Sequence, residues 1–213
     1  MKSWKIDKNL YFKRTSDKTR FYNKAILIVC EGTETEPNYF NSFRVKSAKV
    51  IAKGVARNTI GLVEYAKEIY DEAKYQKEIF DEVWCVFDKD NFSIKDFNDA
   101  IAKAKKYKNF KVAYSNESFE LWFLLHFCYQ NTAVPRSDYL SRLGDYLEKL
   151  YGGRYDKNDR SIYEKLLPYQ EVAIRNAKKL LDSYSNTDPF NNSPSTTVHL
   201  LVEELNKYKG CVN

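Results

Sequence analysis

The chain has 213 residues, a length that suits one domain or one domain with a helical extension. Hydrophobic residues make up 43% of it, enough for a hydrophobic core, and its 7 Gly and 5 Pro argue against long disordered stretches. The formal net charge of +6 permits binding to a polyanion but does not by itself require it.

Four cysteines lack CxxC spacing, which argues against a structural zinc site; they are Cys30, Cys85, Cys128 and Cys211. The segment 1–14 has no apolar stretch of signal-peptide length. No window approaches the ~18–20 apolar residues of a membrane span. We therefore expect a cytoplasmic protein without disulfides or membrane association.

The segment 1–24 is polar and basic and predicts a surface arm. After it, four short apolar runs without alternation predict strands buried on both faces, as in a parallel sheet. These strands span residues 25–30, 48–52, 83–87 and 110–114. Predicted helices follow them at residues 37–43, 62–79, 92–107 and 117–129. The alternation predicts an α/β fold with a mostly parallel four-stranded sheet flanked by helices.

Helix start signals mark two of the predicted helices. The first is expected to begin at Pro37, with Thr35 or Glu36 as its cap. The rest of the chain is predicted to be helical, at residues 137–151, 159–182 and 195–208. The residues expected to cap the last helix, whose N-terminus could also bind phosphate, are Ser195, Thr196 and Thr197. The pattern gives a basic arm at 1–24, an α/β core at 25–130 and a helical extension at 131–213 packed on the core.

Acidic side chains follow the first and third predicted strands. Glu31 comes directly after the first strand, and Asp88 and Asp90 come directly after the third. Ligands of an open parallel sheet bind beyond the carboxyl ends of its strands, so all three should project at one edge. Carboxylates brought together repel unless a cation lies between them, and their oxygens suit Mg²⁺ or Mn²⁺. Such residues also commonly cap the next helix, and a DxD pattern alone is a weak signal.

A divalent cation at this edge would give the site its chemistry. It can polarise a phosphoryl oxygen and activate water, and two such ions can clamp both the attacking and the leaving oxygen. We therefore expect the site to act on a nucleic-acid phosphodiester.

Two segments carry a resemblance to a known fold. Residues 26–32 (ILIVCEG) and 86–90 (VFDKD) resemble the TOPRIM fold of topoisomerases, primases and OLD-type nucleases. In that family a Glu after the first strand and a DxD after the third are the metal and catalytic residues. The resemblance implies these roles for Glu31, Asp88 and Asp90. Topoisomerases also use a separate domain with a nucleophilic Tyr, which this chain is too short to supply, so cleavage by metal-activated water is expected.

A fuller set of motifs resembles the RloB-like family. The matching segments are 30–40 (CEGTETEPNYF), 115–122 (SNESFELW), 125–127 (LHF) and 192–198 (NSPSTTV). Members of that family are associated with bacterial abortive infection and restriction loci. The resemblance implies a defence context. We also expect a partner subunit from a defence locus or self-association of the chain.

Further side chains could join the acidic site. Glu36 could reach the same metal cluster, or it could be a first-turn charge favoured by the helix dipole. Glu120 stands among apolar residues where an unpaired charge is costly, which favours a role as ligand or base. His126 could be a general acid or base, or a satisfied histidine in a helix.

A run of lysines is a candidate nucleic-acid surface beside the acidic site, where binding would weaken with salt. The expected contacts are Lys105, Lys106, Lys108 and Lys111. Such a run is equally typical of a solvated helix face. Arginines of the helical part offer an alternative surface; they are Arg136, Arg142, Arg154, Arg160 and Arg175.

The sequence thus favours a Mg²⁺-dependent endonuclease (Mn²⁺ being the alternative ion) that hydrolyses DNA or RNA, including tRNA. The expected catalytic residues are Glu31, Asp88, Asp90 and Glu120. The expected metal ligands are Glu31, Asp88, Asp90 and Glu36. The alternative is a non-catalytic subunit that senses a nucleotide or a partner protein through the same acidic pocket.

Overall fold

The structure is a computed structural model that describes residues 24–45, 48–55, 59–89 and 92–209. Three features predicted from the sequence lie outside these residues: the basic arm up to residue 23, Asp90 and Cys211. Among the described residues, no helix combines the length and apolar character needed to cross a membrane.

The sheet has the strand order β2-β1-β3-β4-β5. Its strands are β1 (Lys24–Cys30), β2 (Ala48–Gly54), β3 (Glu82–Asp88), β4 (Phe110–Asn116) and β5 (Ser195–Thr196). The first four strands are parallel, and β5 pairs antiparallel with the end of β4. The predicted α/β fold with a mostly parallel sheet is confirmed.

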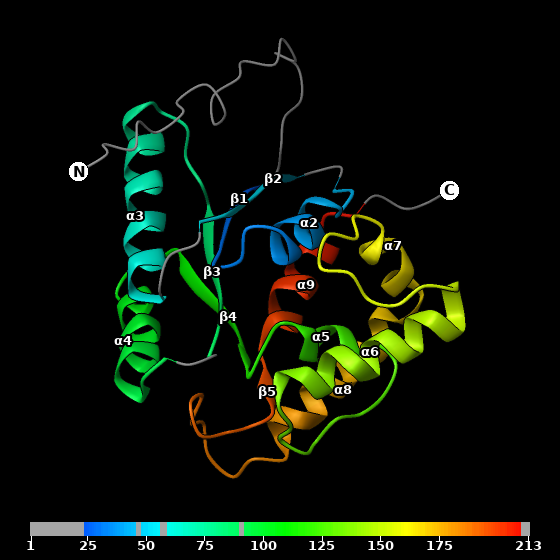
Figure 1. Cartoon of the computed structure of the whole chain (residues 1–213). Helices are drawn as coiled ribbons and strands as arrows, with labels where there is room; N and C mark the ends of the chain where they lie inside the picture. The colour runs from blue at the N-terminus through cyan, green and yellow to red at the C-terminus, as the bar shows by residue number, and fades with distance from the viewer. Residues whose placement is uncertain (1–23, 46–47, 56–58, 90–91, 210–213) are drawn as a thin grey trace, which may run out of the picture.

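Helices cover both faces of the sheet (Figure 1). On one face lie α3 (Thr59–Tyr75) and α4 (Ile94–Lys105), packed against Leu27 and Val29 of β1. The other face, with Ile26 and Ile28, belongs to a second core that continues into the remaining helices. These are α2 (Thr35–Asn41), α5 (Glu120–Leu124), α6 (Arg136–Tyr151), α7 (Ile162–Leu166), α8 (Gln170–Asp182) and α9 (Val198–Asn206). Alternate residues of β1 therefore enter different cores, which explains its continuous apolar sequence.

Lys24 links the start of the sheet to the last helix. Its ammonium lies 2.6 Å from Glu82 Oε1 on β3 and 2.9 Å from Glu204 Oε1 on α9. The other face of α9 packs into the core through Leu201 and Leu205. Both the ion pairs and the core contacts therefore join the C-terminal helices to the sheet.

Several predicted element boundaries were wrong. The helix predicted for 117–129 is reduced to α5, because the amides of His126 and Phe127 bond to carbonyls three residues back and close tight turns. The helix predicted for 159–182 divides into α7, a 3₁₀ turn (Leu167–Tyr169) and α8, since Pro168 has no amide hydrogen to donate.

The cap predicted for α2 was wrong, and the cap predicted for α9 is formed in part. Helix α2 begins at Thr35 after Glu34, with no side-chain cap, so Pro37 lies inside its first turn. Ser195 and Thr196 form strand β5, and the Thr196 hydroxyl also accepts from the Val198 amide at the start of α9 at 3.3 Å. The Thr197 hydroxyl accepts from the amide of Tyr114 on β4, so it serves the sheet and not the helix.

Candidate active site

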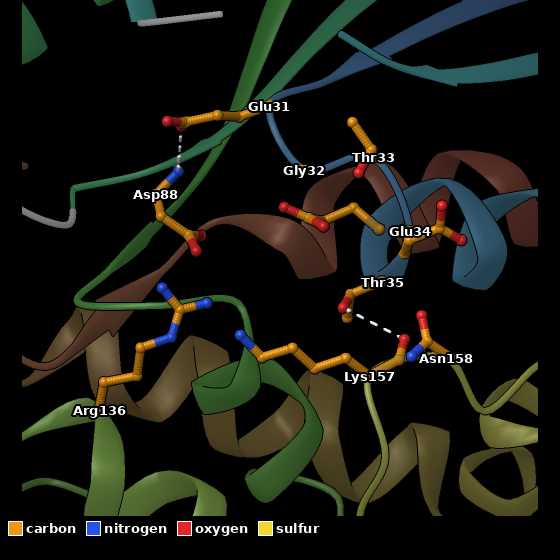
Figure 2. A pocket seen from close by; sticks show the side chains of 10 residues that line it. Glu31, Gly32, Thr33, Glu34, Thr35, Asp88, Arg136, Lys157 and Asn158 are labelled. Carbon is orange, nitrogen blue, oxygen red and sulfur yellow. Dashed lines mark hydrogen bonds between the residues drawn. The ribbon is translucent and has the colours of Figure 1, made fainter. Parts of the chain in front are cut away.

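The register of β1 and β3 brings Glu31 and Asp88 to the same sheet edge. Cys30 pairs with Val86, and the Glu31 amide donates to the Val86 carbonyl at 2.9 Å, extending the ladder by one bond. The Asp88 amide then donates to Glu31 Oε2 at 3.3 Å. In Figure 2 the Glu31 carboxylate lies beside this amide, whereas the Asp88 carboxylate points toward Arg136.

Three carboxyl side chains form a buried acidic cluster, which we define as Glu36, Asp88 and Glu120. Their exposed fractions are 6%, 8% and 0%. Burial, and then the charges of Glu36 and Glu120, raise the pKa of Asp88 well above its ordinary value. Burial, followed by the charge of Glu120, also raises the pKa of Glu36. The cluster is therefore electrostatically costly to keep ionised without a counter-charge.

Local backbone contacts hold the members of this cluster. The Phe119 amide donates to Asp88 Oδ2 at 3.0 Å, while Asp88 Oδ1 has no hydrogen-bond partner among the described residues. Gly32 leaves room for the Glu36 carboxylate, because a Cβ there would lie 2.2 Å from Glu36 Oε2. A Cβ on Gly54 would likewise lie 2.2 Å from the Gly32 carbonyl. The absence of two side chains thus lets the turn after β1 close against β2 and leaves room for the Glu36 carboxylate.

Cationic groups of the helical extension face these acids. Arg136, the first residue of α6, lies 3.4 Å from Glu120 Oε2 through Nη2. Lys157 lies on the loop between α6 and α7, and its carbonyl is 3.5 Å from the Thr35 hydroxyl. In Figure 2 the Arg136 guanidinium and the Lys157 ammonium both point into the space below Asp88 and Thr33.

These groups line a cleft of about 380 Å³ at the junction of core and extension. Its lining residues are Glu31, Gly32, Thr33, Glu34, Thr35, Glu36, Asp88, Arg136, Lys157 and Asn158. The acidic side comes from the ends of β1 and β3 and the start of α2, and the cationic side from α6 and the following loop. The cleft can therefore hold an anionic ligand beside a divalent cation.

The acidic cluster fits a divalent cation by its chemistry. All its donors are carboxylate oxygens, and Asp88 Oδ1 and both Glu120 carboxylate oxygens accept no hydrogen bond from described residues. A bound cation would offset the repulsion that raises the pKa values of Asp88 and Glu36. Within the described residues, no three His, Cys, Asp or Glu side chains already stand in metal-holding geometry. Asp90, the remaining predicted ligand, lies outside them.

A comparison with protein-family models identifies the family of this chain. The model of the RloB-like protein family matches residues 26–205. The chain belongs to the RloB-like protein family. The RloB-like match spans the acidic edge, the cationic loop and the last helix, so the whole cleft lies inside it. No curated protein and no solved structure matches the chain.

The lysine run lies away from the RloB-like cleft. Lys105, Lys106 and Lys108 are exposed at the end of α4 and in the following turn. The Val83 amide donates to the Asn109 carbonyl at 2.9 Å, which places this turn at the start of β3. The acidic cluster lies at the other end of that strand, about 17 Å away at ~3.3 Å per residue. Lys111 is paired with Glu82 at 2.7 Å, so these lysines do not line the cleft.

The two histidines occupy buried positions outside the cleft lining. His126 is 1% exposed, its Nδ1 lies 2.9 Å from the Trp122 carbonyl, and burial lowers its pKa to about 4. Because the carbonyl can only accept, Nδ1 carries the proton. The pKa of His199 is also lowered, chiefly by burial. These features agree with a structural histidine and not with an acid or base in the cleft.

Lys157, Asn158 and Tyr155 were not singled out from the sequence. Tyr155 is half-buried, and burial, then the charge of Glu120, raises its pKa. Arg136 stood only among five candidate arginines. Arg136, Lys157 and Asn158 reach the cleft because α6 packs on α5 and the following loop lies against the start of α2. No short spacing pattern in the sequence records these contacts.

Proposed function

We propose that this chain is a metal-dependent nuclease that hydrolyses phosphodiester bonds of DNA or RNA in bacterial anti-phage defence. The observation that carries the proposal is the buried acidic cluster, placed at the carboxyl ends of β1 and β3 and faced by two cationic side chains. Burying three carboxyl groups side by side costs stability, which a purely structural site does not require. The association of RloB-like family members with bacterial abortive infection and restriction loci supports the defence setting.

The residues of the cleft suit distinct roles in hydrolysis. Asp88, Glu36 and Glu120 would hold Mg²⁺ or Mn²⁺, and Asp90, which lies outside the described residues, stays a predicted further ligand. The cation would supply charge stabilisation at the scissile phosphate and lower the pKa of water. Glu31 accepts a hydrogen bond from the Asp88 amide, which fixes its carboxylate beside the cluster as an additional ligand or a general base. The TOPRIM resemblance, with a Glu after β1 and an Asp after β3, supports this assignment.

The test is cleavage by the purified chain. Plasmid DNA, single-stranded DNA and total RNA containing tRNA are incubated with Mg²⁺, Mn²⁺ or EDTA, and the products are separated on gels. We expect cleavage with metal only, and a loss of about 100-fold or more in Asp88→Asn and Glu31→Gln. Asp99→Asn is the matched control, because Asp99 is exposed on α4 and, among the described residues, forms an ion pair with Lys95. Full activity of Asp88→Asn in metal-controlled buffer would refute the proposal.

A second candidate function rests on the size of the cleft. About 380 Å³ falls within the range of small-molecule sites, and both anionic and cationic groups line it. A non-catalytic sensor that binds a nucleotide with its metal there would fit these features. For such a sensor, calorimetry should detect nucleotide binding, and no nucleic acid should be cleaved in the presence of metal. Requirement for a partner subunit would show as cleavage restored by proteins of the same locus.

A further inference from the structure

We propose that Arg136 and Lys157 of the helical extension bind backbone phosphates of the nucleic acid, opposite the buried acidic cluster. The inference rests on the proposed nuclease function and assigns the substrate contacts that it needs. It moves the phosphate-binding surface from the lysine run of α4 to the cleft itself.

The acidic cluster cannot attract a polyanion without help. Three buried carboxyl groups and Glu31 lie at this edge, and when ionised they carry more negative charge than one divalent cation offsets. A phosphodiester that approaches this edge therefore needs cationic groups on the opposite side. Arg136 and Lys157 are the two cationic residues among those that line the cleft in the described part of the chain.

Arg136 is placed to contact both the cluster and a ligand. Its side chain is 35% exposed, whereas the Glu120 side chain that it pairs with is 1% exposed. Arg136 Nη2 lies 3.4 Å from Glu120 Oε2, at the edge of the cleft. Five N–H donors in a planar arrangement suit a phosphate, which accepts two of them at once. Arg136 can therefore contact a phosphate while it remains beside Glu120.

Lys157 provides a second cation with a different setting. It is exposed, and its ammonium forms no ion pair with any described residue although it points into an acidic cleft. Its backbone lies against the start of α2 through the Thr35 hydroxyl, which places the loop beside the acidic turn. The loop starts at Gly152, whose φ of 77° lets the chain leave α6 sharply and return toward the core. Lys157 is thus a positively charged group directed at the place a substrate phosphate would occupy.

Binding of fluorescently labelled oligonucleotides tests the inference without relying on turnover. Single-stranded DNA, single-stranded RNA and duplex DNA are titrated in EDTA and in Mg²⁺, at several salt concentrations, and followed by anisotropy. We expect Lys157→Gln and Arg136→Gln each to weaken binding by about three- to tenfold. Each should also lower the slope of log K against log salt by about 0.7 for a single strand or 0.9 for a duplex. Lys157→Arg keeps the positive charge, so it should keep both the affinity and the salt dependence of the wild type.

Matched controls separate the cleft from general surface charge. Lys149→Gln on α6 removes an exposed cation of the same extension, and it should bind like the wild type. The triple variant Lys105→Gln, Lys106→Gln, Lys108→Gln tests the rival surface. Arg136→Gln leaves buried Glu120 without its partner, so its melting temperature is measured as well. Lys157→Gln is exposed and keeps the test valid if Arg136→Gln unfolds.

The outcomes distinguish this inference from the nuclease proposal. The inference is overturned if Lys157→Gln binds with the affinity of the wild type while the lysine triple variant loses binding. Cleavage lost in Asp88→Asn would then still support the nuclease. If no wild-type chain binds any oligonucleotide, the phosphate contacts are refuted directly. If Lys157→Gln weakens binding as expected but the wild type cleaves no nucleic acid, the phosphate contacts are supported and the nuclease proposal is refuted.

Discussion

Gly32 illustrates how one missing side chain shapes the candidate site. An added Cβ would lie 2.2 Å from Glu36 Oε2 and 2.8 Å from the carboxyl carbon, so the Glu36 side chain would have to leave the cluster. We predict that Gly32→Ala folds, because its neighbour is the end of a flexible side chain. Displacing a ligand by about 1 Å costs roughly 100-fold in rate, and we expect a loss of this size in metal-dependent cleavage.

Gly153→Ala is the control for that substitution. No atom lies within 4 Å of a Cβ at Gly153, and the residue lies in the loop after α6. Its cleavage rate and melting temperature should match the wild type. Equal activity of Gly32→Ala and Gly153→Ala would show that the position of the Glu36 carboxylate does not matter.

His126 gives the chain a specific sensitivity to acid. Its pKa is lowered from 6.5 to about 4 in the folded state by burial, so it stays neutral where the unfolded chain takes up a proton. Between these values the unfolded state binds more protons, so stability is present above pH 6.5 and is lost as pH falls toward 4. The full loss is roughly 3 kcal/mol. We predict that His126→Asn removes this part of the pH dependence in urea unfolding at pH 7 and pH 4.5.

Comparing the wild type with His126→Asn isolates the contribution of His126 to the pH dependence of stability. The pKa values of Asp88 and Glu36 are raised, chiefly by burial. Their contribution to the pH dependence of stability has the opposite sign, because the folded state becomes more stable as they are protonated. The asparagine amide can still donate to the Trp122 carbonyl in place of Nδ1. Identical pH profiles for wild type and His126→Asn would show that the histidine is not neutral in the fold.

At the scale of elements, local sequence predicted the strands well and the helices less so. The four buried strands are visible because apolar runs such as residues 26–30 face two cores at once. Strand β5 was missed because two residues, Ser195 and Thr196, form it through pairing with Ser115 and Asn116, about eighty positions earlier. Such pairing depends on tertiary contacts that no local pattern encodes.

The candidate site also combines residues that the local sequence predicts with a residue that only tertiary packing brings into place. Glu31 and Asp88 meet because parallel strands end at one edge, a rule that needs only the order of elements. Glu36 and Glu120 join them from the first residues of α2 and α5, the helices that follow β1 and β4, so proximity in sequence to strand ends was enough. Lys157 reaches the cleft through packing of the extension, which only the three-dimensional structure reveals.

At the scale of the whole molecule, the candidate metal site opposes stability. The Asp88 carboxyl is buried, and its pKa is raised by that burial and by Glu36 and Glu120, so the fold disfavours its ionised form. The wild type therefore gains stability as pH falls from this raised pKa toward the ordinary value of about 3.9. We predict that in EDTA at pH 7 Asp88→Asn melts at a higher temperature than the wild type, by about 2–4 °C for each kcal/mol relieved.

Divalent cations should reverse this order. A cation that binds only the folded chain at a hundred times its Kd adds about 2.7 kcal/mol, or about 5–10 °C in Tm for a chain of this size. Adding Mg²⁺ or Mn²⁺ should therefore raise the Tm of the wild type and leave Asp88→Asn nearly unchanged. Asp99→Asn, which alters an exposed pair on α4, should respond to metal like the wild type. If Asp88→Asn melts lower in EDTA and gains as much from metal as the wild type, the carboxyl cluster is a structural feature and binds no cation.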